Sequence, residues 1–137
     1  EFEFIQDNFS RSNKNVLRGL HLQLKYPQGK LVRVVRGEVQ DIVVDMRTSS
    51  STFRKYESVI LSEENKRQLW IPPGFAHGFL VLSEVADFEY KVTSYYDPSD
   101  EITILWNDST INLPWLRPNP LVSEKDSRGI TLEDFLR

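Results

Sequence analysis

Asn15-Val-Leu-Arg-Gly-Leu-His-Leu-Gln23, followed by Lys30-Leu-Val-Arg-Val-Val-Arg-Gly-Glu-Val-Gln-Asp-Ile-Val-Val-Asp45, decides the fold of this chain. Two runs rich in β-branched residues, Lys30–Val35 and Val39–Asp45, flank Gly37, which can take the positive φ of a tight turn. We therefore predict a β-hairpin. The same stretch sets an arginine, a histidine and a lysine beside apolar strands, which indicates that the chemistry is carried by a rigid sheet.

Short apolar runs recur along the rest of the chain, separated by proline and glycine. The expected strands are Phe2–Ile5, Val16–Leu24, Tyr56–Leu61, Gln68–Ile71, His77–Leu82, Asp87–Thr93 and Ile102–Trp106. The polar stretch Gln6–Asn15 is expected to be a loop. This spacing is typical of an all-β sandwich or barrel made of antiparallel sheets.

The C-terminal third differs in composition from the strands. Thr131-Leu-Glu-Asp134 resembles a helix N-cap with an acidic residue three positions on, so we expect a short C-terminal helical turn. The proline-rich stretch Leu113–Pro120 carries Trp115 and is interpreted as a packed extended crossing rather than a linker.

Length and composition exclude several classes of protein. The 137 residues are enough for one domain, 1–137, and too few for two ordinary ones. The net charge is -3 and the 17 basic residues are scattered, which argues against a nucleic-acid partner. No run approaches the roughly 20 apolar residues of a membrane span, and no signal peptide opens the chain. Cysteine is absent, which is compatible with a reducing compartment, so we expect a soluble cytoplasmic protein without a membrane partner.

Three polar side chains within the predicted strands are candidates for chemistry. His21 and His77, the only histidines, lie in or beside apolar segments, where a histidine is often a core residue bound to a carbonyl. However, Arg18 and Lys30 are near neighbours suited to an anionic substrate. Tyr90 shares a strand face with two apolar residues, and a core tyrosine with a satisfied hydroxyl explains that pattern equally well.

Six short motifs follow one another along the chain: Gln6-Asp-Asn8, Leu17-Arg-Gly-Leu-His21, Pro27-Gln-Gly-Lys-Leu-Val32, Gln68-Leu-Trp-Ile-Pro72, Gly74-Phe-Ala-His-Gly-Phe79 and Lys125-Asp126. In content and order they resemble the motifs of the dTDP-4-dehydrorhamnose 3,5-epimerase family, which acts on dTDP-4-keto-6-deoxyglucose. The resemblance covers Gln6 to Asp126 and implies a cupin-type jelly-roll barrel with a ligand cavity between two antiparallel sheets.

The resemblance also implies catalytic roles. His21 matches the general base and Asp126 the carboxylate that orients it, although more than a hundred residues separate them. Tyr90 matches the proton donor on the opposite face of the sugar. Lys30 matches a group that stabilises the enolate oxygen, and His77 contributes to the same task.

Further positions match substrate contacts of the family. Arg18 suits a bidentate phosphate contact. Tyr96 matches the aromatic residue that stacks on thymine, although a tyrosine before Asp97-Pro98 also fits an ordinary turn. The other matching contacts are Gln6, Asp7, Asn8, Glu101 and Lys125.

We therefore expect a cofactor-independent isomerase that inverts carbons 3 and 5 of the keto sugar, in dTDP-L-rhamnose biosynthesis. Epimerisation of a single carbon and a non-catalytic sugar-nucleotide-binding module are alternatives. Cupins often bind metals, but a His-x-His pair is absent here, so no metal or other cofactor is expected. Exposed sheet edges and the family resemblance predict a homodimer.

One feature of the family has no counterpart in the printed sequence. The resemblance implies a further N-terminal strand region, whose Asp-x-Arg-Gly-like motif supplies an arginine and a glutamate to the nucleotide site. The chain opens at Glu1-Phe-Glu-Phe4, so we expect this N-terminal segment of the family to be missing.

Overall fold

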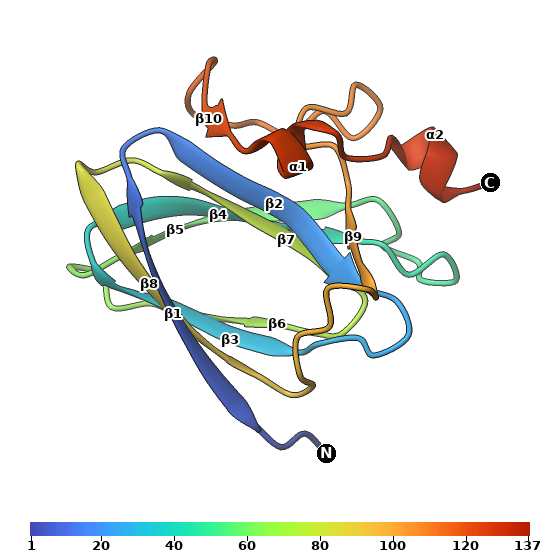
Figure 1. Cartoon of the computed structure of the whole chain (residues 1–137), viewed down its shortest axis with the longest axis horizontal. Helices are drawn as coiled ribbons and strands as arrows, with labels where there is room; N and C mark the ends of the chain where they lie inside the picture. Colours follow the sequence, from blue (N-terminus) through green and yellow to red (C-terminus); the bar gives the residue numbers. More distant parts are fainter.

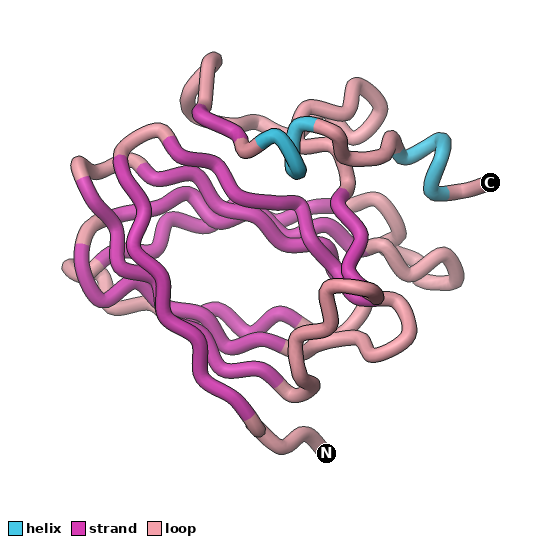
Figure 2. The backbone as a smooth tube through the Cα atoms, in the orientation of Figure 1, coloured by secondary structure: helices cyan, strands magenta, loops and turns pink.

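Two β-sheets face each other in the computed structural model, which describes all residues 1–137 (Figures 1 and 2). The four-stranded sheet has the order β1 (Gln6–Asn13), β8 (Val85–Val92), β3 (Lys30–Arg36) and β6 (Gln68–Ile71). The six-stranded sheet has the order β10 (Leu121–Val122), β2 (Val16–Gln23), β7 (Phe75–Val81), β4 (Glu38–Asp45) and β5 (Tyr56–Ser62), with β9 (Glu101–Thr103) also on β2. All pairs are antiparallel except β10 with β2, so the prediction of an all-β, two-sheet fold is confirmed.

Helical structure is confined to two short segments near the C-terminus. In α2 (Leu132–Phe135) the Thr131 side chain accepts a hydrogen bond from the Asp134 N–H, which confirms the predicted cap. The segment α1 (Glu124–Ser127), capped by Ser123, was not predicted. Neither helix is long and apolar enough to cross a membrane.

The predicted hairpin is wrong, although both of its strands exist. β3 pairs with β6 and β8, whereas β4 pairs with β5 and β7, so the two strands belong to different sheets. Gly37 has φ +86°, and a Cβ added there would lie 2.2 Å from the Val85 carbonyl oxygen. The glycine therefore lets the chain turn a corner from one sheet to the other instead of folding back on itself.

The N-terminal prediction is also wrong. Gln6–Asn13 is a strand rather than a loop, and its side chains alternate between partly buried and exposed. Its inward residues are polar because they face a cavity, so the sequence lacks the apolar alternation of an ordinary strand. Phe2–Ile5 is not a strand, and Phe2 packs against Trp70 at 5.2 Å between ring centroids.

Apolar residues fill both sides of the six-stranded sheet. One cluster lies between the sheets and includes Val32, Val39 and Phe88. In the other cluster, Ile42 on the opposite face of β4 packs with residues that include Leu132 of α2. The C-terminal third of the chain covers that outer face (Figure 1). Leu113 and Trp115 pack against the second cluster, so the interpretation of Leu113–Pro120 as a packed segment is confirmed. The remaining space between the sheets is polar.

Candidate active site

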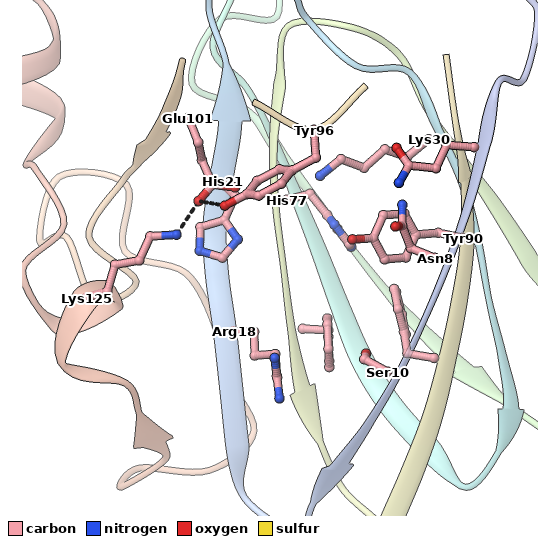
Figure 3. A pocket seen from close by; sticks show the side chains of 13 residues that line it. Asn8, Ser10, Arg18, His21, Lys30, His77, Tyr90, Tyr96, Glu101 and Lys125 are labelled. Atoms are coloured by element: carbon pink, nitrogen blue, oxygen red, sulfur yellow. Dashed lines mark hydrogen bonds and ion pairs between the residues drawn. The ribbon is translucent and has the colours of Figure 1, made fainter. Parts of the chain in front are cut away.

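A cavity of about 350 Å³ opens between the two sheets, within the size range of small-ligand sites. Its lining residues are Gln6, Asn8, Ser10, Arg18, His21, Lys30, His77, Phe79, Phe88, Tyr90, Tyr96, Glu101 and Lys125. They come from strands of both sheets, from the segment between β8 and β9, and from α1 (Figure 3). The fold thus gathers all the predicted site residues around one cavity except Asp7 and Asp126.

Asp7 lies outside the cavity. Successive residues of β1 point to opposite sides, so Gln6 and Asn8 face inward while Asp7 faces outward. Its carboxylate pairs with the Lys91 Nζ at 2.9 Å on the outer side of the sheet. The structure therefore does not bring Asp7 together with the other predicted substrate contacts around the cavity.

Asp126 lies directly behind His21. The His21 Nε2 is 2.7 Å from the Asp126 Oδ1, and the Gly19 N–H donates to Oδ2 at 3.1 Å. The Asp126 N–H donates to the Ser123 Oγ, so the cap of α1 fixes the carboxylate. No protein group bonds to Nδ1 of His21. This nitrogen is left for a ligand.

The surroundings of Asp126 keep its carboxylate ionised. Burial by itself would raise the pKa of Asp126, but the hydrogen bond and charge of His21, the Gly19 N–H and the Lys125 ammonium together lower that pKa below its usual value. An ionised carboxylate stabilises an imidazolium that forms beside it. The pair is therefore suited to accept a proton and hold it.

A second histidine–carboxylate pair lies deeper in the site. The His77 Nε2 is 2.7 Å from the Asp41 Oδ2, and both side chains are buried. The His77 ring is stacked on Phe88, with 5.9 Å between centroids. Nε2 is occupied, so Nδ1 is the nitrogen of His77 that remains for a ligand.

Burial dominates the protonation of this second pair. It raises the pKa of Asp41, against the opposing effects of His77 and Lys30. It also lowers the pKa of His77, against the attraction of Asp41. Burial therefore favours the neutral forms of Asp41 and His77 more than water does.

Lys30 and Tyr90 lie next to each other on neighbouring strands. The Lys30 Nζ is 5.9 Å from the centroid of the Tyr90 ring. Burial lowers the pKa of Lys30, while Glu101 and Asp41 oppose that change. Burial, followed by the charges of Glu101 and Tyr96, raises the pKa of Tyr90. The phenol therefore keeps its proton at neutral pH and is able to donate it.

His21 and Tyr90 face each other across the cavity. His21 belongs to β2 in one sheet and Tyr90 to β8 in the other, and Figure 3 shows them on opposite sides of the space. A planar group bound between them would have a base on one face and an acid on the other.

Cationic and aromatic groups line another part of the cavity. The Arg18 Nε donates to the Ser12 Oγ at 3.0 Å, which orients the guanidinium and leaves its outer nitrogens free. Lys125 pairs with Glu101, and this hydrogen bond raises the pKa of the lysine. Tyr96 lies beside Glu101 (Figure 3). This combination suits a phosphorylated ligand with a flat ring.

Three cavity residues, and one carboxylate behind the cavity, were missed in the sequence. Ser10 follows Gln6 and Asn8 at the strand period and was hidden by the loop prediction for that segment. Phe79 and Phe88 resemble ordinary core residues. Asp41 interrupts the apolar run of β4, and a carboxylate in a strand so apolar was a signal that could have identified it.

The histidine and carboxylate side chains of the site form two separate pairs, His21 with Asp126 and His77 with Asp41. No group of three or more histidine, cysteine, aspartate or glutamate side chains is placed to hold a metal ion. Each pair presents one imidazole nitrogen that can exchange a proton or a hydrogen bond with a ligand.

Comparison with known proteins gives a consistent result. Residues 1–134 match the family model described as dTDP-4-dehydrorhamnose 3,5-epimerase. The Shigella flexneri protein of that name is 60% identical over 128 residues, which are 93% of this chain and 71% of that protein. A solved epimerase from Legionella pneumophila, in complex with dTDP-4-keto-L-rhamnose, superposes with a TM-score of 0.94 at 51% identity, covering 99% of this chain and 72% of that one.

The chain is also similar in structure to an epimerase with a different activity. The structure of a 3'-monoepimerase from Streptomyces bikiniensis, in complex with dTDP-quinovose, has a TM-score of 0.91 at 31% identity, covering 97% of this chain and 68% of that one. The identity is clearly higher for the 3,5-epimerases. From its sequence, its fold and the geometry of its cavity, the chain belongs to the dTDP-4-dehydrorhamnose 3,5-epimerase family.

Proposed function

We propose that this chain epimerises dTDP-4-keto-6-deoxy-D-glucose at carbons 3 and 5 to give dTDP-4-keto-L-rhamnose, a step of dTDP-L-rhamnose biosynthesis. The observation that carries the proposal is the opposition of His21, backed by Asp126, and Tyr90 across one cavity. Inversion of a stereocentre requires removal of a proton from one face and its replacement on the other. Two groups on one side of the sugar would restore the starting configuration.

The proposed step begins at a carbon next to the ketone. His21 takes the proton through Nδ1, and the electron pair of the broken C–H bond forms a C=C bond while the carbonyl becomes an enolate. Tyr90 then delivers its phenolic proton to the opposite face of that carbon, and the ketone forms again. The first inversion leaves His21 protonated and Tyr90 as a phenolate, so His21 then releases its proton to water and Tyr90 takes one from water. The ketone acidifies both neighbouring carbons, and with both groups restored a second cycle at the other carbon follows the same course.

Lys30 and His77 are proposed to stabilise the enolate oxygen. The Lys30 ammonium supplies positive charge in a buried setting, where such an interaction is strong. In a neutral His77–Asp41 pair, the carboxyl group donates its proton to Nε2, and the imidazole proton stays on Nδ1. That nitrogen is then a donor towards the cavity without carrying a full charge.

The nucleotide is proposed to occupy the cationic part of the cavity. Arg18 and Lys125 would contact the diphosphate, and the Tyr96 ring would stack on thymine. Gln6, Asn8 and Glu101 would bind polar groups of the sugar nucleotide. Gln6, Asn8 and Glu101 all line the cavity, which supports their assignment as ligand contacts.

Turnover of the keto sugar nucleotide tests the proposal directly. Proton abstraction next to a ketone needs no metal or redox group, so we expect full activity in the presence of a chelator. In deuterated solvent, product NMR should show deuterium at carbons 3 and 5. No turnover and no deuterium incorporation would contradict the proposed activity and favour a sugar-nucleotide-binding module.

Epimerisation of a single carbon is a second candidate, because the 3'-monoepimerase structure is closely similar. The same NMR experiment separates the two activities. Deuterium at one carbon of the product would favour the single inversion. Deuterium at both carbons, in a product with both centres inverted, would favour the 3,5-epimerase.

We further propose that the 137 residues act as one jelly-roll epimerase domain in a cytoplasmic homodimer. Both sheets line the same cavity, which supports a single functional unit. The outer face of the four-stranded sheet exposes Phe9 and Trp70, and β1 is an edge strand. Sedimentation at low micromolar concentration tests the assembly, and a folded, active monomer would contradict it. Cell fractionation tests the location.

A further inference from the structure

A buried glutamine at the end of β2 holds the segment that carries Tyr96. Gln23 is 3% exposed, and its side-chain amide makes three hydrogen bonds. Its Nε2 donates to the Tyr26 carbonyl at 2.8 Å and to the Tyr95 carbonyl at 3.2 Å. Its Oε1 accepts from the Asp97 N–H at 2.8 Å. One amide group therefore binds the residues on both sides of Tyr96.

Tyr96 depends on these neighbours for its position. It makes no backbone hydrogen bond of its own, and the residue is 49% exposed. Its only side-chain contact by hydrogen bonding is from the hydroxyl to the Glu101 Oε1, at 3.5 Å (Figure 3). Glu101 is in turn the cross-strand partner of Gln23. Gln28 also holds this segment through the Ser94 carbonyl, but the hydrogen bonds to the two residues that flank Tyr96, at the Tyr95 carbonyl and the Asp97 N–H, come from Gln23. Without Gln23, the Tyr96 ring would lose these two adjacent anchors.

The same strand carries the proposed base. His21 and Gln23 are two residues apart on β2, so their side chains lie on the same face of the strand. The distance between the site of proton transfer and the anchor of the Tyr96 segment is thus set by a rigid strand. An extended ligand that contacts both His21 and Tyr96 would therefore find these two side chains at a fixed distance from each other.

We propose that Gln23 is a positioning residue that acts through Tyr96 to bind the nucleotide base. This inference rests on the proposed function, because it takes the Tyr96 ring as the platform for the base. Gln23 does not line the cavity and so makes no contact with the ligand. Its removal should weaken nucleotide binding and leave the proton-transfer groups in place.

Gln40 is a matched control within the same chain. It is 2% exposed and its amide also makes three hydrogen bonds, to the Ser58 Oγ, the Pro114 carbonyl and the Leu116 N–H. It holds a segment on the outer side of the six-stranded sheet and does not line the cavity. Gln40→Met therefore removes the same kind of interaction without disturbing Tyr96.

The test compares Gln23→Met with Gln40→Met. For Gln23→Met we expect the KM for the keto sugar nucleotide and the Kd for dTDP, measured by calorimetry, to rise about tenfold, the effect of losing a few buried hydrogen bonds. We expect kcat at saturation to stay within about twofold, because His21 and Tyr90 are unaffected. We expect both variants to lower Tm by similar amounts, because each loses three buried hydrogen bonds. Gln40→Met should nevertheless leave KM and Kd unchanged. Equal effects of both variants on KM would overturn the proposal.

A double-mutant cycle shows whether Gln23 acts through Tyr96. We expect Gln23→Met to have no further effect on the Kd for dTDP in a Tyr96→Ala background. Additive losses, or a fall in kcat with unchanged Kd, would contradict the proposal. If Gln23→Met does not fold, Gln23→Asn serves instead, with an expected rise of about threefold, because the shorter amide cannot reach all three partners.

The proposed function and this inference fail in different ways. Absence of turnover by the wild-type protein would refute the epimerase proposal, whereas the Kd for dTDP would still report on Gln23. Normal turnover by the wild-type protein, with an unchanged Kd in Gln23→Met, would refute the positioning role alone.

Discussion

Two histidine–carboxylate pairs in this molecule have the same geometry and opposite surroundings. In each pair the imidazole Nε2 lies 2.7 Å from a carboxylate oxygen. The Asp126 carboxylate also accepts the Gly19 N–H, and the His21 side chain is 25% exposed. Asp41 is fully buried, and its Oδ1 has no hydrogen-bond partner. The pKa of Asp126 is lowered, whereas that of Asp41 is raised.

The same short distance between an imidazole and a carboxylate therefore serves different chemistry in the two pairs. Additional donors around Asp126 favour its charged form, which supports an imidazolium on His21. Burial around Asp41 favours neutral forms, which suits a hydrogen-bond donor rather than a base. One pair is thus fitted for moving a proton, and the other for stabilising charge that develops on the substrate.

The largest effect is expected from breaking the proton-transferring pair. His21→Asn removes the proposed base. Asp126→Asn removes the negative charge that stabilises the imidazolium of His21. Each change should lower kcat by about a hundredfold or more while the fold remains intact. Steady-state kinetics and circular dichroism check this prediction. Wild-type rates in both variants would exclude His21 from the mechanism.

A large but selective effect is expected for the acid that faces this pair. Tyr90→Phe keeps the ring and removes the proton donor, so formation of inverted product should fall about a hundredfold. His21 is unchanged, so exchange of carbon-bound hydrogen with deuterated solvent should continue. NMR of the substrate and product measures both rates. A parallel fall in exchange and inversion, or no fall in either, would favour a core role for Tyr90.

A smaller loss is expected when the buried pair is changed. In Asp41→Asn the amide can still donate to the His77 Nε2 in one of its two orientations, so the donor at Nδ1 is only partly lost. We expect kcat to fall about tenfold, less than for Asp126→Asn, because one stabilising donor is weakened and not removed. Kinetics of the two variants side by side provide the measurement. An equal or larger loss in Asp41→Asn would reverse the roles assigned to the two pairs.

The smallest effect concerns the change of folding stability with pH, which has opposite sign for Asp126 and Asp41. The lowered pKa of Asp126 contributes stability that is present above its unfolded-state pKa of about 3.9 and is lost as pH falls through the folded-state value. The raised pKa of Asp41 contributes stability that is present below about pH 3.9 and is lost as pH rises through the folded-state value.

Urea unfolding of both Asp→Asn variants from pH 3 to 7 measures this difference, using the range in which the carboxylates titrate. As pH rises, the wild-type protein should gain stability relative to Asp126→Asn and lose it relative to Asp41→Asn. The slopes should not exceed about 1.4 kcal/mol per pH unit for one proton. Parallel pH profiles for the two variants would contradict the opposite pKa shifts.

The sequence predicted the elements better than their pairing. The β-branched runs of β3 and β4 were recognised because strand propensity and side-chain period are local properties. Their assignment to one hairpin was wrong because a glycine with positive φ fits both a hairpin turn and a corner between sheets. β1 was missed because its inward side chains line a cavity and are polar, so local hydrophobicity did not reveal it.

The sequence by itself determined the all-β class, the capped C-terminal turn and the family, because ordered motifs and local propensities are written in the chain. Only the tertiary structure decided which groups meet. It brought Asp126 to His21 across 105 residues, joined Asp41 to His77 and turned Asp7 away from the cavity. The physical reason is that strand pairing is non-local, and a register offset of one residue decides whether a side chain faces the ligand or the solvent.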